Sequence, residues 1–198
     1  MRYGAKGLMW APFAESDPEP AGKLPNYGKA ISLGSLVELV DAPAFAEAKG
    51  YGDDELKCFV SEFKECPLTI KVTSLPRASA GAVFGSKLEG PGETESAGEM
   101  TYNSDDHAPY GGLAFYIKEQ LDDNQTAYMG IFFPKVKATP GGNTYTTKGD
   151  SITLTAHGLS MLASAAKNGD WKKESDYFDT EAEAIAWRDK KLASSVGP

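Results

Sequence analysis

Residues 111–138 read GGLAFYIKEQLDDNQTAYMGIFFPKVKA and carry the clearest fold signal in the chain. Two runs rich in aromatic and β-branched residues, 111–121 and 127–138, are separated by a short segment whose Asp and Asn residues suit a turn. This pattern predicts an antiparallel β-hairpin. Pro134 lies inside the second run, and because proline cannot donate a hydrogen bond to a strand ladder, we expect a bulge or a sheet edge near it.

Shorter strands are predicted on both sides of this hairpin. Residues 7–14 (GLMWAPFA) form an apolar run, and residues 29–40 (KAISLGSLVELV) alternate between two faces with the period of a half-buried strand. The segments 55–60 and 65–75 are predicted to be the two arms of a second hairpin. Residues 170–178 follow the tight-turn signal Asn-Gly and are predicted to be a last strand.

A first helix is predicted for RASAGAVF, residues 77–84. Ser74 is placed to cap it, Pro76 lies near the first turn where its missing N–H costs little, and Gly85 is a stop signal.

A second helix is predicted for TEAEAIAWRDKKLA, residues 180–193, where Thr180 and Glu183 have the spacing of a capping box. Together these elements give about eight strands and two helices without strict strand–helix alternation. The fold class is therefore α+β, mainly β: an antiparallel β-sandwich or open barrel with two flanking helices. A chain of 198 residues fits a single domain, 1–198.

Several segments of the chain are predicted to be an arm or long loops. The region of about 1–28 is interpreted as an N-terminal arm, and 41–54, 89–106 and 139–150 as long loops. The extended segments 15–28, 41–54 and 139–150 are longer than the connections of a compact monomer need, so we expect them to become ordered on assembly.

Charge is concentrated in one of these loops. The chain has a net charge of −8, which argues against a protein that grips nucleic acid, because such binding depends on Lys and Arg. Between residues 89 and 106 there is no Lys or Arg, and six carboxylates lie there: Glu89, Glu93, Glu95, Glu99, Asp105 and Asp106. We expect this acidic loop to be exposed, because clustered like charge resists burial.

Residues with catalytic or metal-binding potential are sparse. Cys58 and Cys66 lie eight residues apart in the predicted second hairpin and are interpreted as two free thiols of a reducing compartment. His107 follows two aspartates, but no further ligand cluster is visible. No nucleophile elbow or phosphate-binding loop is present, so no catalytic residue, cofactor or metal is predicted. No run of about 18 apolar residues exists, and the first residues lack a secretory leader pattern, so we expect a soluble protein made in the cytoplasm, with no membrane insertion.

Five stretches carry a resemblance that runs over nearly the whole chain. They are YGAKGLMWAPFAE (3–15), CPLTIKVTSLPRASAGAVFGSKL (66–88), DDHAPYGGLAFYIKE (105–119), YMGIFFPKVKAT (128–139) and GDWKKESDYFDTEAEAIAWRDK (169–190). In this order they resemble the major tail proteins of siphophages that infect Gram-positive bacteria. The last two stretches are the most specific.

The resemblance implies a structural virion protein that assembles into stacked, hexameric rings and forms the tail tube, the conduit for DNA ejection. Its partners would be further copies of itself and other tail proteins: the tape measure, the tail terminator and the distal tail protein. DNA would pass through without specific binding. The acidic loop 89–106 is interpreted as facing the lumen, and an outside position is the alternative. For the subunit interface we select Trp10, Phe45, Tyr51 and Tyr145.

Three other functions remain open on the residues alone. A carbohydrate-binding β-sandwich module of a phage adhesion device would use exposed aromatics as a sugar platform. A tail-completion protein would form a single terminating ring. An enzyme would need a pocket with perturbed carboxylates, which the sequence does not indicate.

Overall fold

The computed structural model describes residues 1–90, 98–122, 125–140, 142, 145, 147 and 155–193. Within them it has two helices, α1 (Arg77–Phe84) and α2 (Glu181–Lys191), and eleven strands. The strands are β1 (Arg2–Pro12), β2 (Ile31–Ser32), β3 (Leu36–Asp41), β4 (Ala44–Gly52), β5 (Glu55–Val72), β6 (Lys87–Glu89), β7 (Glu99–Thr101), β8 (Tyr110–Gln120), β9 (Thr126–Pro140), β10 (His157–Ala163) and β11 (Lys173–Glu174).

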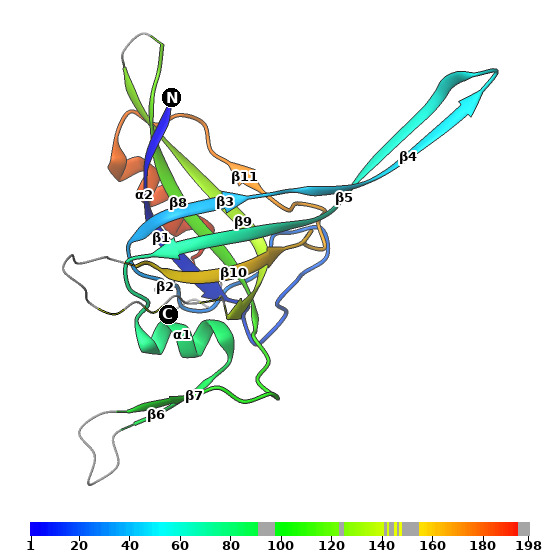
Figure 1. Cartoon of the computed structure of the whole chain (residues 1–198). Helices are drawn as coiled ribbons and strands as arrows, with labels where there is room; N and C mark the ends of the chain where they lie inside the picture. The colour runs from blue at the N-terminus through cyan, green and yellow to red at the C-terminus, as the bar shows by residue number, and fades with distance from the viewer. Residues whose placement is uncertain are drawn as a thin grey trace.

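One large antiparallel sheet dominates the molecule, with the strand order β2-β1-β8-β9-β10-β5-β3. It folds over on itself, so that β3, β5 and β10 cross in front of β1, β8 and β9 (Figure 1). The sheet does not close into a barrel. The expected α+β, mainly β class with antiparallel strands and two helices is confirmed.

The β8–β9 hairpin lies in the middle of the sheet and is buried on both faces. Phe115 and Phe133 point into the main core, whereas Ala114 and Phe132 pack in a second cluster on the opposite face. The predicted irregularity near Pro134 is confirmed, since the ladder shifts register there. The Pro134 carbonyl leaves the ladder and accepts a hydrogen bond of 2.7 Å from the hydroxyl of buried Tyr27.

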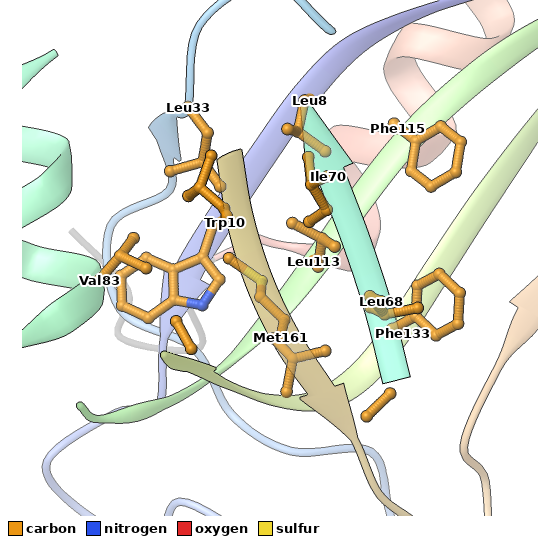
Figure 2. Packing of buried hydrophobic residues seen from close by; sticks show 14 of the residues in the cluster. Leu8, Trp10, Leu33, Leu68, Ile70, Val83, Leu113, Phe115, Phe133 and Met161 are labelled. Carbon is orange, nitrogen blue, oxygen red and sulfur yellow. The ribbon is translucent and has the colours of Figure 1, made fainter. Parts of the chain in front are cut away.

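The main core fills the space between the two layers of the folded sheet (Figure 2). Side chains from five strands meet there, and α1 adds Val83 at one end. Trp10 of β1 is only 1% exposed and lies beside Val83 and Met161 (Figure 2). The strand predicted over residues 7–14 is confirmed by β1, which lies between β2 and β8 and begins already at Arg2, so the N-terminal arm expected over about 1–28 is wrong for residues 2–12. The apolar run GLMWAPFA makes β1 a core element, because burying such side chains between two layers is favourable.

The second cluster lies between the outer face of the β1–β8–β9 layer and α2. The predicted capping box of α2 is confirmed: the Thr180 hydroxyl accepts a hydrogen bond from the Glu183 amide at 3.3 Å, and the Glu183 carboxylate accepts one from the Thr180 amide at 3.1 Å. Trp187 packs here against Gly130, where a Cβ atom would overlap the indole ring.

α1 ends at Gly85 as predicted, but Pro76 is its N-cap and no side chain caps it, so the expected role of Ser74 is wrong.

Two predicted strands are divided or shortened. The run 29–40 is split into β2 and β3 around Gly34. The φ angle of Gly34 is 95°, a conformation that residues with a side chain rarely adopt and that interrupts a strand. The predicted last strand, 170–178, is reduced to β11 and a single bridge between Phe178 and Tyr128.

The most consequential difference concerns residues 41–75. The predicted loop 41–54 contains β4, and the two predicted arms 55–60 and 65–75 belong mainly to one continuous strand, β5. β4 was missed because its alanines and glycines have low strand propensity, whereas its pairing with β5 supplies the backbone hydrogen bonds. Cys58 and Cys66 therefore lie on one strand and do not face each other; both are free.

Candidate assembly surface

β3, β4 and β5 form one long hairpin that leaves the body of the protein (Figure 1). Asp41 pairs with Leu68 and Ala44 with Glu65, so the register is unchanged between β3 and β4. The amide of Ala42 donates to the Pro67 carbonyl at 3.1 Å and keeps the connection extended. We call residues 44–65, the half of this hairpin beyond the body, the distal arm.

A two-residue turn closes the distal arm. Asp53 and Asp54 have φ angles of 52° and 61°, as the central residues of a type I′ turn do. The arm has nine residues in β4, which at about 3.4 Å per residue gives a reach of about 30 Å.

The distal arm has one face rich in aromatic residues. Residues paired across a hairpin share a face, so register places Phe45 with Phe63, Lys49 with Phe59, and Tyr51 with Leu56 on the same side. We call this side the aromatic face. Tyr51 is 70% exposed and Phe59 is 52% exposed, so this apolar surface is open to solvent. The other face pairs small residues, Ala48 and Gly50, with Val60 and Cys58.

The base of the arm is braced against the body. The Trp171 ring stacks on Phe63 with centroids 4.5 Å apart and planes 11° apart, and Phe63 meets Phe45 edge-on at 6.0 Å. Next to it, the Lys172 ammonium contacts Asp41 at 2.7 Å and Glu174 at 2.9 Å. Burial alone would lower the pKa of Lys172, but hydrogen bonds to these two carboxylates outweigh it and raise the pKa. The body thus fixes the direction in which the arm leaves.

Backbone edges of the arm are also free. Among the described residues, the outer edge of β4 pairs with no strand, and β5 has a second neighbour only over residues 66–72. A two-stranded hairpin is marginally stable in water by itself. An exposed apolar face between two open edges is therefore a surface suited to contact with another polypeptide.

The interface residues selected from the sequence lie in three different places. Phe45 and Tyr51 lie together on the aromatic face. Trp10 is buried in the core and offers no surface, so its selection is wrong. Tyr145 is exposed in the region 139–150, much of which lies outside the described residues. Sequence reasoning missed Leu56, Phe59 and Phe63, because it did not recognise β4, whose pairing with β5 places these side chains beside Phe45 and Tyr51 on one face.

The β6–β7 hairpin, which carries Glu89 and Glu99, lies at the opposite end of the molecule from the distal arm (Figure 1). Glu89 and Glu99 face each other across the β6–β7 hairpin, and the Lys87 ammonium at 2.8 Å lowers the pKa of Glu89. Asp105 and Asp106 lie in the turn after β7, where Asp106 accepts a 2.9 Å hydrogen bond from the Asn103 amide. Glu93 and Glu95 lie outside the described residues.

Side chains that could bind a metal ion do not cluster in the part of the chain that the structure describes. No set of three or more His, Cys, Asp or Glu residues there could hold a metal ion. His107 and His157 are both exposed, the first in the loop before β8 and the second at the start of β10. No helix among these residues is long and apolar enough to cross a bilayer.

Comparison of the chain with protein-family models and with curated proteins finds no match.

Proposed function

We propose that this chain is a structural, non-enzymatic subunit that assembles with copies of itself into stacked rings, as the tail tube of a long-tailed bacteriophage. The distal arm is the observation that carries the proposal. A monomer leaves its aromatic face and both backbone edges in water, and neighbouring copies would cover them.

The direction of the arm supports a ring over a simple pair. The arm projects to one side of the body, away from β1 and α2 (Figure 1). A contact between an arm and a different surface of the next copy is heterologous, and such contacts close into rings or continue as filaments. The hexameric number and the partnership with tape measure, terminator and distal tail proteins rest on the family resemblance described above. The assembled location would be the virion tail.

The proposal is tested by electron microscopy and light scattering of the purified chain, concentrated and incubated. We expect rings or tubes of uniform diameter. The double substitution Tyr51→Ser with Phe59→Ser should leave the protein monomeric with an unchanged unfolding midpoint, because both side chains lie outside the core.

Tyr102→Ser is the matched control, since Tyr102 is also an exposed aromatic but lies beside α1. It should assemble as the parent does. Monodisperse wild-type monomers at every concentration, together with saturable binding to glycans, would favour the carbohydrate-binding alternative instead.

A further inference from the structure

The corner where the folded sheet stays open contains a slot. In the described residues no ladder joins β1 to β3, although the two strands lie close together. Between them is a cavity of about 350 Å³. Its apolar lining consists of Ala5, Val37, Leu39, Phe115, Ile117 and Ile131.

An apolar side chain that entered this slot would contact the main core directly. Phe115, Ile117 and Ile131 belong to the core cluster and also line the slot. Val37 stands at the mouth, 55% exposed, at a register shift in β3. Large apolar side chains at such a position are unfavourable in water and gain by being covered.

The tip of the distal arm carries apolar side chains that are open to solvent. Tyr51 and Leu56 form the last apolar pair of the aromatic face before the turn, and both are mostly exposed. The arm points away from β1, so the tip cannot enter the slot of its own chain (Figure 1). A second copy is therefore the occupant that fits.

Charges on the two surfaces are complementary. On the rim of the slot, Glu38 pairs with Lys71 at 2.6 Å and Asp41 with Lys172 at 2.7 Å, so these groups satisfy each other. Arg2 differs: its guanidinium is 54% exposed, and its carboxylate contacts of 3.5 and 3.9 Å are longer than good hydrogen bonds.

The arm tip offers carboxylates that Arg2 can bind. Asp53 and Asp54 form the turn and have no ion-pair partner among the described residues, whereas the neighbouring Glu55 is paired with Lys57 at 2.7 Å. An apolar pair beside two carboxylates without an ion-pair partner thus complements an apolar slot whose rim carries Arg2, which is held only by long contacts to Glu119 and Glu174.

We infer that the distal-arm tip of one copy docks in the slot between β1 and β3 of a second copy, with Tyr51 and Leu56 inside it and Asp53 and Asp54 at Arg2. This inference rests on the self-assembly proposed above and names the receiving surface. Donor and receptor are different parts of the chain, so a docked pair still has one free tip, on the acceptor copy, and one free slot, on the donor copy.

Disulfide cross-linking between two separately made variants tests the docking. Both carry Cys58→Ser, because Cys58 is exposed on the arm, and one carries Tyr51→Cys while the other carries Val37→Cys and a size tag. After mixing, assembly and mild oxidation, we expect a cross-linked dimer of unequal chains. Replacing the second variant by Tyr102→Cys, which is exposed but remote from the slot, should reduce the yield at least about tenfold.

The two proposals fail in different ways. Rings or tubes in the same mixture without the Tyr51–Val37 cross-link would overturn this docking and leave the assembly proposal standing. Monomers of the unsubstituted chain at every concentration, together with no cross-link in the mixture, would overturn both.

A charge exchange gives a second test. Arg2→Glu should raise the concentration needed for half-maximal assembly by about tenfold, because a rim carboxylate would then face the acidic tip. Adding Asp53→Arg and Asp54→Arg to the same chain should restore assembly. If the arginine tip fails to restore it while unfolding midpoints stay equal, the tip does not meet Arg2 and the docking is wrong.

Discussion

Gly130 is the residue on which the seating of α2 depends. Its backbone lies against the indole of Trp187, and its amide donates to the Ser175 hydroxyl at 2.8 Å. Gly130→Ala would push a methyl group into the Trp187 ring, so we expect a loss of about 1–3 kcal/mol in the free energy of unfolding. Gly90→Ala is the control, because no atom lies within 4 Å of a Cβ there. Equal urea midpoints for the two variants would contradict this packing.

Tyr116 should make stability sensitive to high pH. Burial and the 2.8 Å hydrogen bond to Glu181 raise its pKa to about 12, above the value of about 10 in an unfolded chain. Between about pH 10 and pH 12 the unfolded chain therefore loses the proton first, and the free energy of unfolding falls as pH rises. Below pH 10 the contribution is complete.

Tyr116→Phe should flatten that fall without removing it, because burial also raises the pKa of Tyr27. The measurement is urea unfolding of both proteins at steps between pH 8 and pH 12. Identical slopes would show that the Tyr116 hydroxyl is free to ionise in the folded protein.

Among the secondary-structure elements, the distal arm depends on Trp171 for its position. Its ring stacks on Phe63 near the point where the arm leaves the body. Trp171→Ala should leave the sheet folded but speed amide exchange in β4 and the distal part of β5, because a two-stranded ribbon without its brace opens more often. We expect tube assembly to weaken in parallel.

Trp187→Ala is the matched control for this prediction. It also removes a half-buried tryptophan, but one that packs α2 against β9, so faster exchange should appear in α2 and not in the arm. Faster exchange spread evenly over the sheet in Trp171→Ala would mean that Trp171 stabilises the whole fold and does not position the arm.

Elements with local signals could be predicted from the sequence, and those that depend on distant partners could not. The β8–β9 hairpin, the bulge at Pro134 and the capping box of α2 each follow from neighbouring residues. The strand β4 does not, because alanine and glycine extend there only through pairing with β5.

The same distinction between local signals and distant partners applies to the residues of the candidate assembly surface. Phe45 and Tyr51 could be selected as exposed aromatics of a polar segment, but Trp10 has the same composition signal and is in the core. Only the fold decides which aromatic faces water, because burial of Trp10 follows from the position of β1 between β2 and β8.

At the scale of the whole molecule, the distal arm and the acidic end, the end that carries Glu89 and Glu99 on the β6–β7 hairpin, are separate regions (Figure 1). Assembly and passage of DNA should therefore respond to different substitutions. Six carboxylates without a Lys or Arg between residues 89 and 106 would repel phosphates if they faced the lumen of a tube. Glu93→Gln, Glu95→Gln and Glu99→Gln together should then slow DNA ejection, since the passing phosphates would be less strongly repelled from the wall. Tube length and diameter should not change.

Neutralising three exposed carboxylates elsewhere controls for the change in total charge. That control consists of Glu15→Gln, Asp17→Asn and Asp176→Asn. Single-particle ejection rates at two ionic strengths provide the measurement, because screening by salt should shrink the difference between the acidic-loop variant and the parent. If the triple Gln variant and the parent eject DNA at the same rate at both salt concentrations, the acidic end faces the outside of the tube, and its charge serves the surface of the assembled particle.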